Sequence, residues 1–193
     1  MVRYLSCLLL PFLCLAFAAQ AQDPFDTFKQ FSATMVMIGV PEGTMKIYRS
    51  GNKVRVSASG AAGYTIADLD DHTTYTVTNN GTCTQSATHR SATPFALDKS
   101  SAIQRSPAGT DTVDGHPCKV EMMTVTPKSG QPTTMKVWEA EDLKGFPVKI
   151  EMESSRGPMA VAYKNVSFSE PPASLFTHPA NCRQMPTSHI APR

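Results

Sequence analysis

The sequence predicts a mainly β protein, a curved antiparallel meander with a short helical insertion. Apolar and polar residues alternate in about nine segments, and turn residues separate most consecutive segments. Helical periodicity occurs in one short stretch only. Because a flat meander of this length would expose edges that aggregate, we expect the strands to curl around an axis.

Residues 1–21 have the pattern of a secretory signal peptide. Arg3 precedes an apolar run over residues 5–18, which ends in the A-x-A cleavage pattern of residues 19–21. An uncleaved anchor is the alternative, but the run is short for a bilayer span. We therefore expect an exported, periplasmic protein without a stable membrane anchor.

The rest of the chain fits one domain of near-neutral charge. Removing 21 of the 193 residues leaves 172, with a single domain expected over 22–183 and a disordered tail over 184–193. The whole chain has 18 Lys and Arg residues against 16 Asp and Glu residues, with no basic stripe. This balance argues against a nucleic-acid partner.

The first half of the domain predicts consecutive hairpins. In residues 31–38 every second side chain is apolar and falls on one side of a strand. Residues 43–58 form two strands around a Ser-Gly-Asn turn at 50–52, and residues 63–79 form two more around the Asp-Asp-His turn at 70–72.

The middle of the chain, about residues 81–114, is rich in Ser, Thr, Ala and Pro and alternates little. Pro94 is suited to open a helix that carries Phe95, Leu97 and Ile103 as its apolar residues. The sequence therefore predicts a helical or irregular insertion of the size of a lid.

Alternation returns in four segments between residues 116 and 168, and a Pro-bounded segment then closes the domain as irregular chain or a single helical turn. Where alternate residues are apolar, one face of each strand is dry, so the curled sheet would have a concave apolar surface. Methionine is frequent on surfaces that accept varied apolar ligands. The alternative is that these side chains fill a packed core. The candidate ligand-binding residues are Met35, Met45, Val54, Val56, Phe95, Leu97, Ile103, Val120, Met122, Met135, Val137, Val148, Ile150, Met152, Met159 and Val161.

Catalytic, metal and cofactor motifs are not recognisable in the sequence, so we expect no enzyme, no bound metal and no cofactor. The acidic run at 68–71 with His72 lacks the glycine and distal Glu of an EF-hand and is read as a solvated turn. His116 and Cys118 are two residues apart and would share a strand face, which leaves an enzyme as a third hypothesis.

Three cysteines remain after the signal segment: Cys83, Cys118 and Cys182. An oxidising compartment allows one disulfide and one free thiol, and three pairings are possible. We favour Cys83 with Cys118, because each lies beside a predicted strand and those two strands are consecutive.

The second half of the chain carries a series of turn and strand motifs. A strand with an aromatic residue leads through a D-x-x-G-[FL]-P turn into a V-x-x-E strand, and a V-x-F strand and an LF-x-x-P segment follow. This series resembles LolA-like periplasmic proteins, and the resemblance implies a half-open antiparallel barrel closed by helices, which binds acyl chains or other lipid-like ligands. The chain departs from the lipoprotein carriers in its three cysteines and short lid region. The residues that carry the resemblance are Trp138, Asp142, Gly145, Phe146, Pro147, Val148, Glu151, Val166, Phe168, Leu175, Phe176 and Pro179.

We therefore expect a periplasmic carrier of a lipid-like or acylated ligand, with a role related to lipoprotein sorting. The alternative is a cell-envelope sensory or protein-interaction module that holds no small molecule, because an exposed apolar sheet surface also suits a protein partner.

Overall fold

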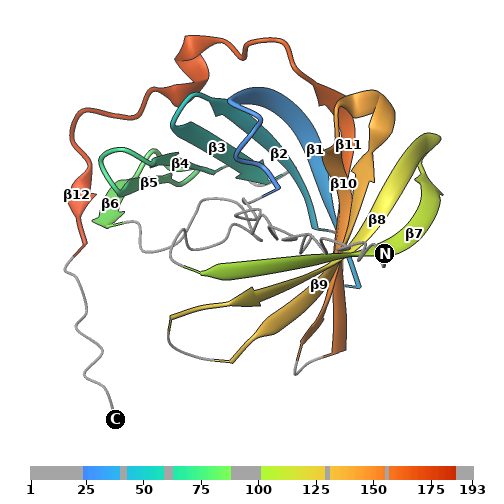
Figure 1. Ribbon diagram of the computed structural model, residues 1–193. Helices are drawn as coiled ribbons and strands as arrows, with labels where there is room; N and C mark the ends of the chain where they lie inside the picture. Colours follow the sequence, from blue (N-terminus) through green and yellow to red (C-terminus); the bar gives the residue numbers. More distant parts are fainter. Residues whose placement is uncertain are drawn as a thin grey trace, which may run out of the picture.

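The computed structural model describes residues 24–39, 43–58, 63–87, 101–128, 131–154 and 157–185. These residues form twelve strands in one sheet and two 3-10 helices (Figure 1). The elements are β1 (Gln30–Ile38), β2 (Gly43–Ser50), β3 (Lys53–Ala58), β4 (Tyr64–Asp68), β5 (Thr73–Val77), β6 (Cys83–Ala87), β7 (Ala102–Val113), β8 (His116–Thr126), β9 (Thr133–Ala140), η1 (Glu141–Leu143), β10 (Phe146–Ser154), β11 (Gly157–Ser167), η2 (Ala173–Phe176) and β12 (Arg183–Gln184).

The sheet is a half-open barrel, as the sequence predicts. Its strand order is β12-β6-β5-β4-β3-β2-β1-β11-β10-β9-β8-β7, so two meanders meet where β1 pairs with β11. β12 pairs with β6 in parallel, and the other pairs among the described strands are antiparallel. β12 and β7 lie at opposite ends of this order and leave the sheet open.

The turn between β9 and β10 shows how local sequence sets the fold. After η1, Lys144 and Gly145 both have positive φ angles, of 59° and 80°. Glycine adopts this conformation without steric strain. The Gly145 N–H then donates to the Ala140 carbonyl at 2.8 Å and closes the turn. The predicted D-x-x-G-F-P motif is therefore a tight connection that directs Phe146 into the core.

The described parts of the predicted insertion are strands, which corrects the helical expectation for them. Within residues 81–114, β6 and β7 both belong to the sheet, and Ile103 lies on β7. Phe95 and Leu97 lie outside the described residues. β7 tolerates Pro107 and Gly109 because it is an edge strand with a register shift between Pro107 and Thr110.

The two ends of the chain are described only in part. The predicted signal peptide and most of the predicted tail lie outside the described residues, but Gln184 belongs to β12 and the sheet therefore extends past the predicted boundary at 183. The closing segment contains η2, the single helical turn that the sequence allows. Within the described ranges the chain has no helix with the length and apolar character needed to cross a membrane.

Candidate functional site

The candidate site is the apolar inner face of the curved sheet. Directly opposed residues of an antiparallel pair share one face, so the registers trace this face from strand to strand. Met35 on β1 opposes both Met45 on β2 and Tyr163 on β11. Ile47 on β2 opposes Val56 on β3. All five belong to one core cluster or pack against it, and that cluster also contains residues of β8 to β10.

Four methionines form a continuous row on this face. Met159 on β11 opposes Met152 on β10, and Met152 opposes Met135 on β9. Met135 in turn opposes Met123 on β8. Met123 and Met135 are buried, whereas Met152 and Met159 are half-buried. The row therefore presents flexible, polarizable side chains that become more accessible toward β11.

The two ends of the inner face differ. At the end where β1 begins, Phe146 is fully buried and its ring lies 5.1 Å from Phe31 and 5.6 Å from Phe25. Arg49 holds this end together, because its Nη1 donates to the Phe25 carbonyl at 2.9 Å. At the opposite end Met37 and Met45 are only half-buried. Aromatic packing thus closes one end, and methionines line the other.

A charged group lies on the inner face beside the methionine row. Arg105 on β7 opposes Met123 and pairs with Glu139 at 2.7 Å and Glu121 at 3.0 Å. Burial alone would lower the pKa of Arg105, but the hydrogen bonds and charges of the two carboxylates outweigh it and raise that pKa. This pairing compensates the charge at the β7 end of the inner face.

Most of the predicted site residues lie on this inner face or in its core cluster. Val54, Val137, Val148, Ile150 and Val161 are buried. Phe31, Ile47, Met37, Met123 and Val125 belong to the same surface and were not among the predicted residues. The half-buried predicted residues are Met45, Val56, Ile103, Met152 and Met159.

β8 is the strand whose predicted face differs from the structure. Met123 faces inward opposite Met135, so Val120 and Met122 lie on the outer face by alternation. Met122 is 37% exposed, whereas Met123 is 1% exposed. Two adjacent methionines make either face of β8 compatible with the alternation, and the sequence offers no signal that decides between them.

The outer face carries a tryptophan between two lysines. Trp138 is buried, and its indole N–H donates to Asp111 at 2.9 Å. Lys149 and Lys136 place their ammonium groups 4.4 Å and 4.7 Å from the ring centroid. The hydrogen bond from Trp138 lowers the pKa of Asp111, helped by the backbone N–H of Thr112. These contacts satisfy the indole and explain its burial on an outer strand position.

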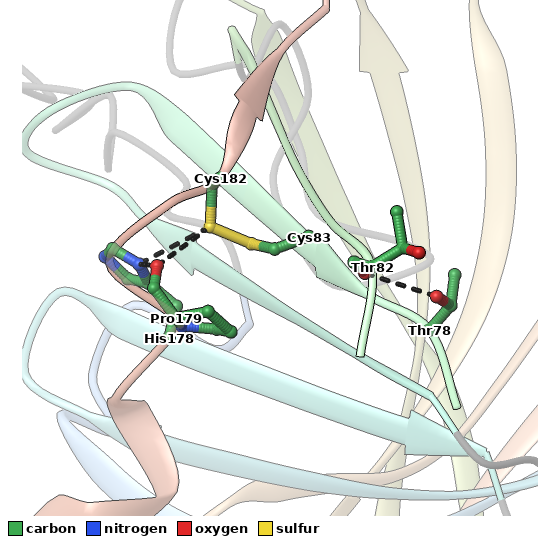
Figure 2. Close-up of a disulfide and its surroundings, with 6 residues drawn as sticks. All are labelled: Thr78, Thr82, Cys83, His178, Pro179 and Cys182. Atoms are coloured by element: carbon green, nitrogen blue, oxygen red, sulfur yellow. Dashed lines mark hydrogen bonds between the residues drawn. A yellow bond between two sulfur atoms is a disulfide. The ribbon is translucent and has the colours of Figure 1, made fainter. Parts of the chain in front are cut away.

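The disulfide joins Cys83 to Cys182, and the predicted pairing of Cys83 with Cys118 is wrong (Figure 2). The segment 169–185 crosses the outer face of the first meander and brings Cys182 to β6 (Figure 1). Arg55 donates to the Leu175 carbonyl at 2.8 Å, and His178 stacks on Tyr75. We call residues 169–185 the strap. It covers the outer side of β3 to β6.

Cys118 is the free thiol among the described cysteines, and its surroundings do not activate it. Its Sγ donates to the His116 carbonyl at 3.2 Å, while the His116 ring bonds to Asp142 at 2.8 Å. Burial raises the pKa of the Cys118 thiol, so the thiolate that nucleophilic catalysis needs is disfavoured. The His116 and Cys118 side chains therefore do not form a nucleophile–base pair.

We predict slow alkylation of Cys118 in the folded protein. Because its thiol is buried and its pKa is raised, iodoacetamide at pH 8 should modify it at least about tenfold more slowly than after unfolding in guanidinium. Mass spectrometry of timed aliquots measures both rates. Equal rates would show that Cys118 is accessible and would reopen the enzyme hypothesis.

The acidic turn at residues 68–72 is held by local hydrogen bonds. Asp68 accepts from the backbone N–H of Asp70 at 3.1 Å, and Asn52 donates to the Asp70 carboxylate at 2.7 and 2.8 Å. These contacts account for the run as turn chemistry. In the described part of the chain, His, Cys, Asp and Glu side chains form no group suited to a metal ion.

The fold is similar to that of several solved structures. The domain of unknown function DUF4412 matches residues 119–182, which is less than half of the chain. No curated protein matches the sequence. A chain of the Pseudomonas aeruginosa MucA/MucB complex matches with 17% identity and a TM-score of 0.52, over 80% of this chain and 57% of that one. The two chains share a fold.

Two further solved structures match less closely. A LolA superfamily protein from Nitrosomonas europaea has 12% identity and a TM-score of 0.38, covering 78% of this chain and 90% of that one. A putative outer membrane lipoprotein-sorting protein domain from Vibrio parahaemolyticus has 10% identity and a TM-score of 0.43, covering 79% and 91%. A LolA superfamily protein is thus among the solved structures that match this chain. The chain spans little more than half of the MucA/MucB chain it matches.

Proposed function

We propose that this protein is a non-catalytic binding protein of the bacterial periplasm that holds the acyl chain of a lipid-like or acylated ligand on its inner face. The observation that carries the proposal is the row of methionines across four strands of an open sheet, with half-buried members at one end. Each buried methylene of a ligand contributes about 0.8 kcal/mol before the cost of ordering the ligand. A role related to lipoprotein sorting is the finer form of this proposal.

Native mass spectrometry of protein purified gently from its own periplasm tests the proposal. We expect a co-purifying lipid or acylated peptide. Met152→Glu should lose it and should bind a fluorescent fatty acid at least about tenfold more weakly, because a carboxylate on the half-buried inner face disfavours an acyl chain. Met122→Glu is the matched control, since Met122 lies on the outer face and should tolerate the charge.

A clean mass without ligand, together with no uptake of the fatty acid, would contradict the carrier. It would mean that the protein's own side chains fill the inner face.

A protein-interaction module is the second candidate function. It is favoured by the fold shared with a chain of the MucA/MucB complex, which is an assembly of two proteins. The long edge strand β7 offers a place for an extended partner segment. A photo-crosslinker at exposed Ser106 should then capture one protein in intact cells, and the same crosslinker at exposed Asp70 should not.

A further inference from the structure

The inner face changes character between β3 and β4. One cross-strand row runs Ala33, Ile47, Val56, Thr65, Thr76 and Thr84, each residue directly opposed to the next across β1 to β6. The β1 to β3 members are aliphatic, and the β4 to β6 members are threonines. The neighbouring inner row runs Val54, Ala67, Thr74 and Ser86, so hydroxyl side chains begin at β5 in that row. The inner surface therefore has an apolar part and a hydroxyl part that are continuous.

The hydroxyl part is not a general feature of these strands. Threonine suits strands anywhere, but the outer positions of β4 to β6 hold Ile66 and Val77, which are buried on the side that the strap covers. The polarity of β5 and β6 is thus reversed relative to β1 to β3, where the inner side is apolar, while the inner side of β4 carries both Thr65 and the buried Ala67. The inner hydroxyl residues Thr65, Thr76 and Thr84 are all half-buried.

We propose that the inner face of β4, β5 and β6 binds an uncharged, hydrogen-bonding head of the ligand whose acyl chain lies on the apolar part. The inference rests on the proposed carrier function and names the class of its ligand, an acylated compound with a hydroxyl, ester or amide head. Opposed side chains are about 5 Å apart, so Thr65, Thr76 and Thr84 offer three successive hydroxyls along one line. A charged head is disfavoured, because half-buried hydroxyls compensate poorly for the desolvation of an ion.

The test compares three probes of equal chain length: a monoacylglycerol, a lysophosphatidate and a pyrene-labelled hydrocarbon without a polar head. The wild type should bind the monoacylglycerol most tightly. The triple variant Thr65→Val, Thr76→Val, Thr84→Val removes three hydroxyls and should weaken monoacylglycerol binding at least about tenfold, with hydrocarbon binding unchanged. Thr34→Val and Thr44→Val on the outer face are the controls and should change neither affinity.

The outcomes separate the two proposals. Hydrocarbon binding with no effect of the triple variant on the monoacylglycerol, or tighter binding of the lysophosphatidate, would overturn the head-group site and leave the carrier intact. If the wild type binds none of the probes, both proposals fail. If the triple variant does not fold, the single variants Thr76→Val and Thr76→Ser test the head-group site. Serine retains a hydroxyl and should leave monoacylglycerol binding unchanged, whereas valine should weaken it by about threefold.

Discussion

Replacing Phe146 by alanine is expected to lower the free energy of unfolding by about 3–5 kcal/mol. The side chain is fully buried, and its ring lies 5.0 Å from that of Phe28 and 5.1 Å from that of Phe31. Tyr163 and Phe168 follow at 6.0 Å and 5.9 Å. Truncation removes the contacts of the central ring and leaves a cavity that rigid neighbouring rings fill poorly.

Urea unfolding of the two proteins, followed by circular dichroism, measures this loss. Phe146→Leu is the matched control at the same position, since it keeps most of the apolar volume and should lose clearly less stability. Phe168→Ala is a second comparison and should lose less stability than Phe146→Ala, because Phe168 is only half-buried and packs at the margin of the cluster. A loss below about 1 kcal/mol for Phe146→Ala would show that the aromatic end collapses onto the missing ring, and hence that it is not rigidly packed.

The sequence was sufficient to predict the meander and much of its inner face. In β1, Phe31, Ala33 and Met35 alternate with polar or smaller residues, and all three are buried as that alternation requires. The face of β8 was ambiguous, because Met122 and Met123 are adjacent and side-chain direction reverses with every residue.

β7 escaped prediction for another reason. Its strand contains Pro107 and Gly109, which normally argue against a strand interior. Its place at the open edge permits both, and edge position is a property of the whole sheet that local sequence does not contain. The hydroxyl part of the inner face could not be predicted from local sequence either, because only the strand registers align Thr65, Thr76 and Thr84.

The disulfide also depends on the whole fold. Cys182 follows β11 in the chain, yet the strap carries it across the outer face to β6, at the far end of the sheet from the second meander. The predicted pairing assumed that Cys83 and Cys118 lie beside consecutive strands. In the structure they lie on β6 and β8, and β7 comes between these strands in the chain. Sequence separation alone does not distinguish these partners.

Removing the disulfide with Cys83→Ala and Cys182→Ala is expected to lower the free energy of unfolding by about 2–5 kcal/mol. The bridge closes a sequence separation of 99 residues, and a long loop restricts the unfolded chain most strongly. Cys118→Ala is the control, because it removes a buried thiol without opening a loop and should cost less.

Hydrogen exchange of the backbone amides measures which part of the fold loses protection when the disulfide is removed. Without the bridge, the strap is held by the stack of His178 on Tyr75, the bond from Arg55 to Leu175 and the two-residue pairing of β12 with β6. Its amides, including that of Met185, which donates to the Gln85 carbonyl at 2.8 Å, should exchange faster, while those of β10 should change little. Unchanged stability and unchanged exchange in the strap would mean that these contacts suffice alone. Faster exchange confined to the strap would instead identify the bridge as the element that keeps the outer side of β3 to β6 covered.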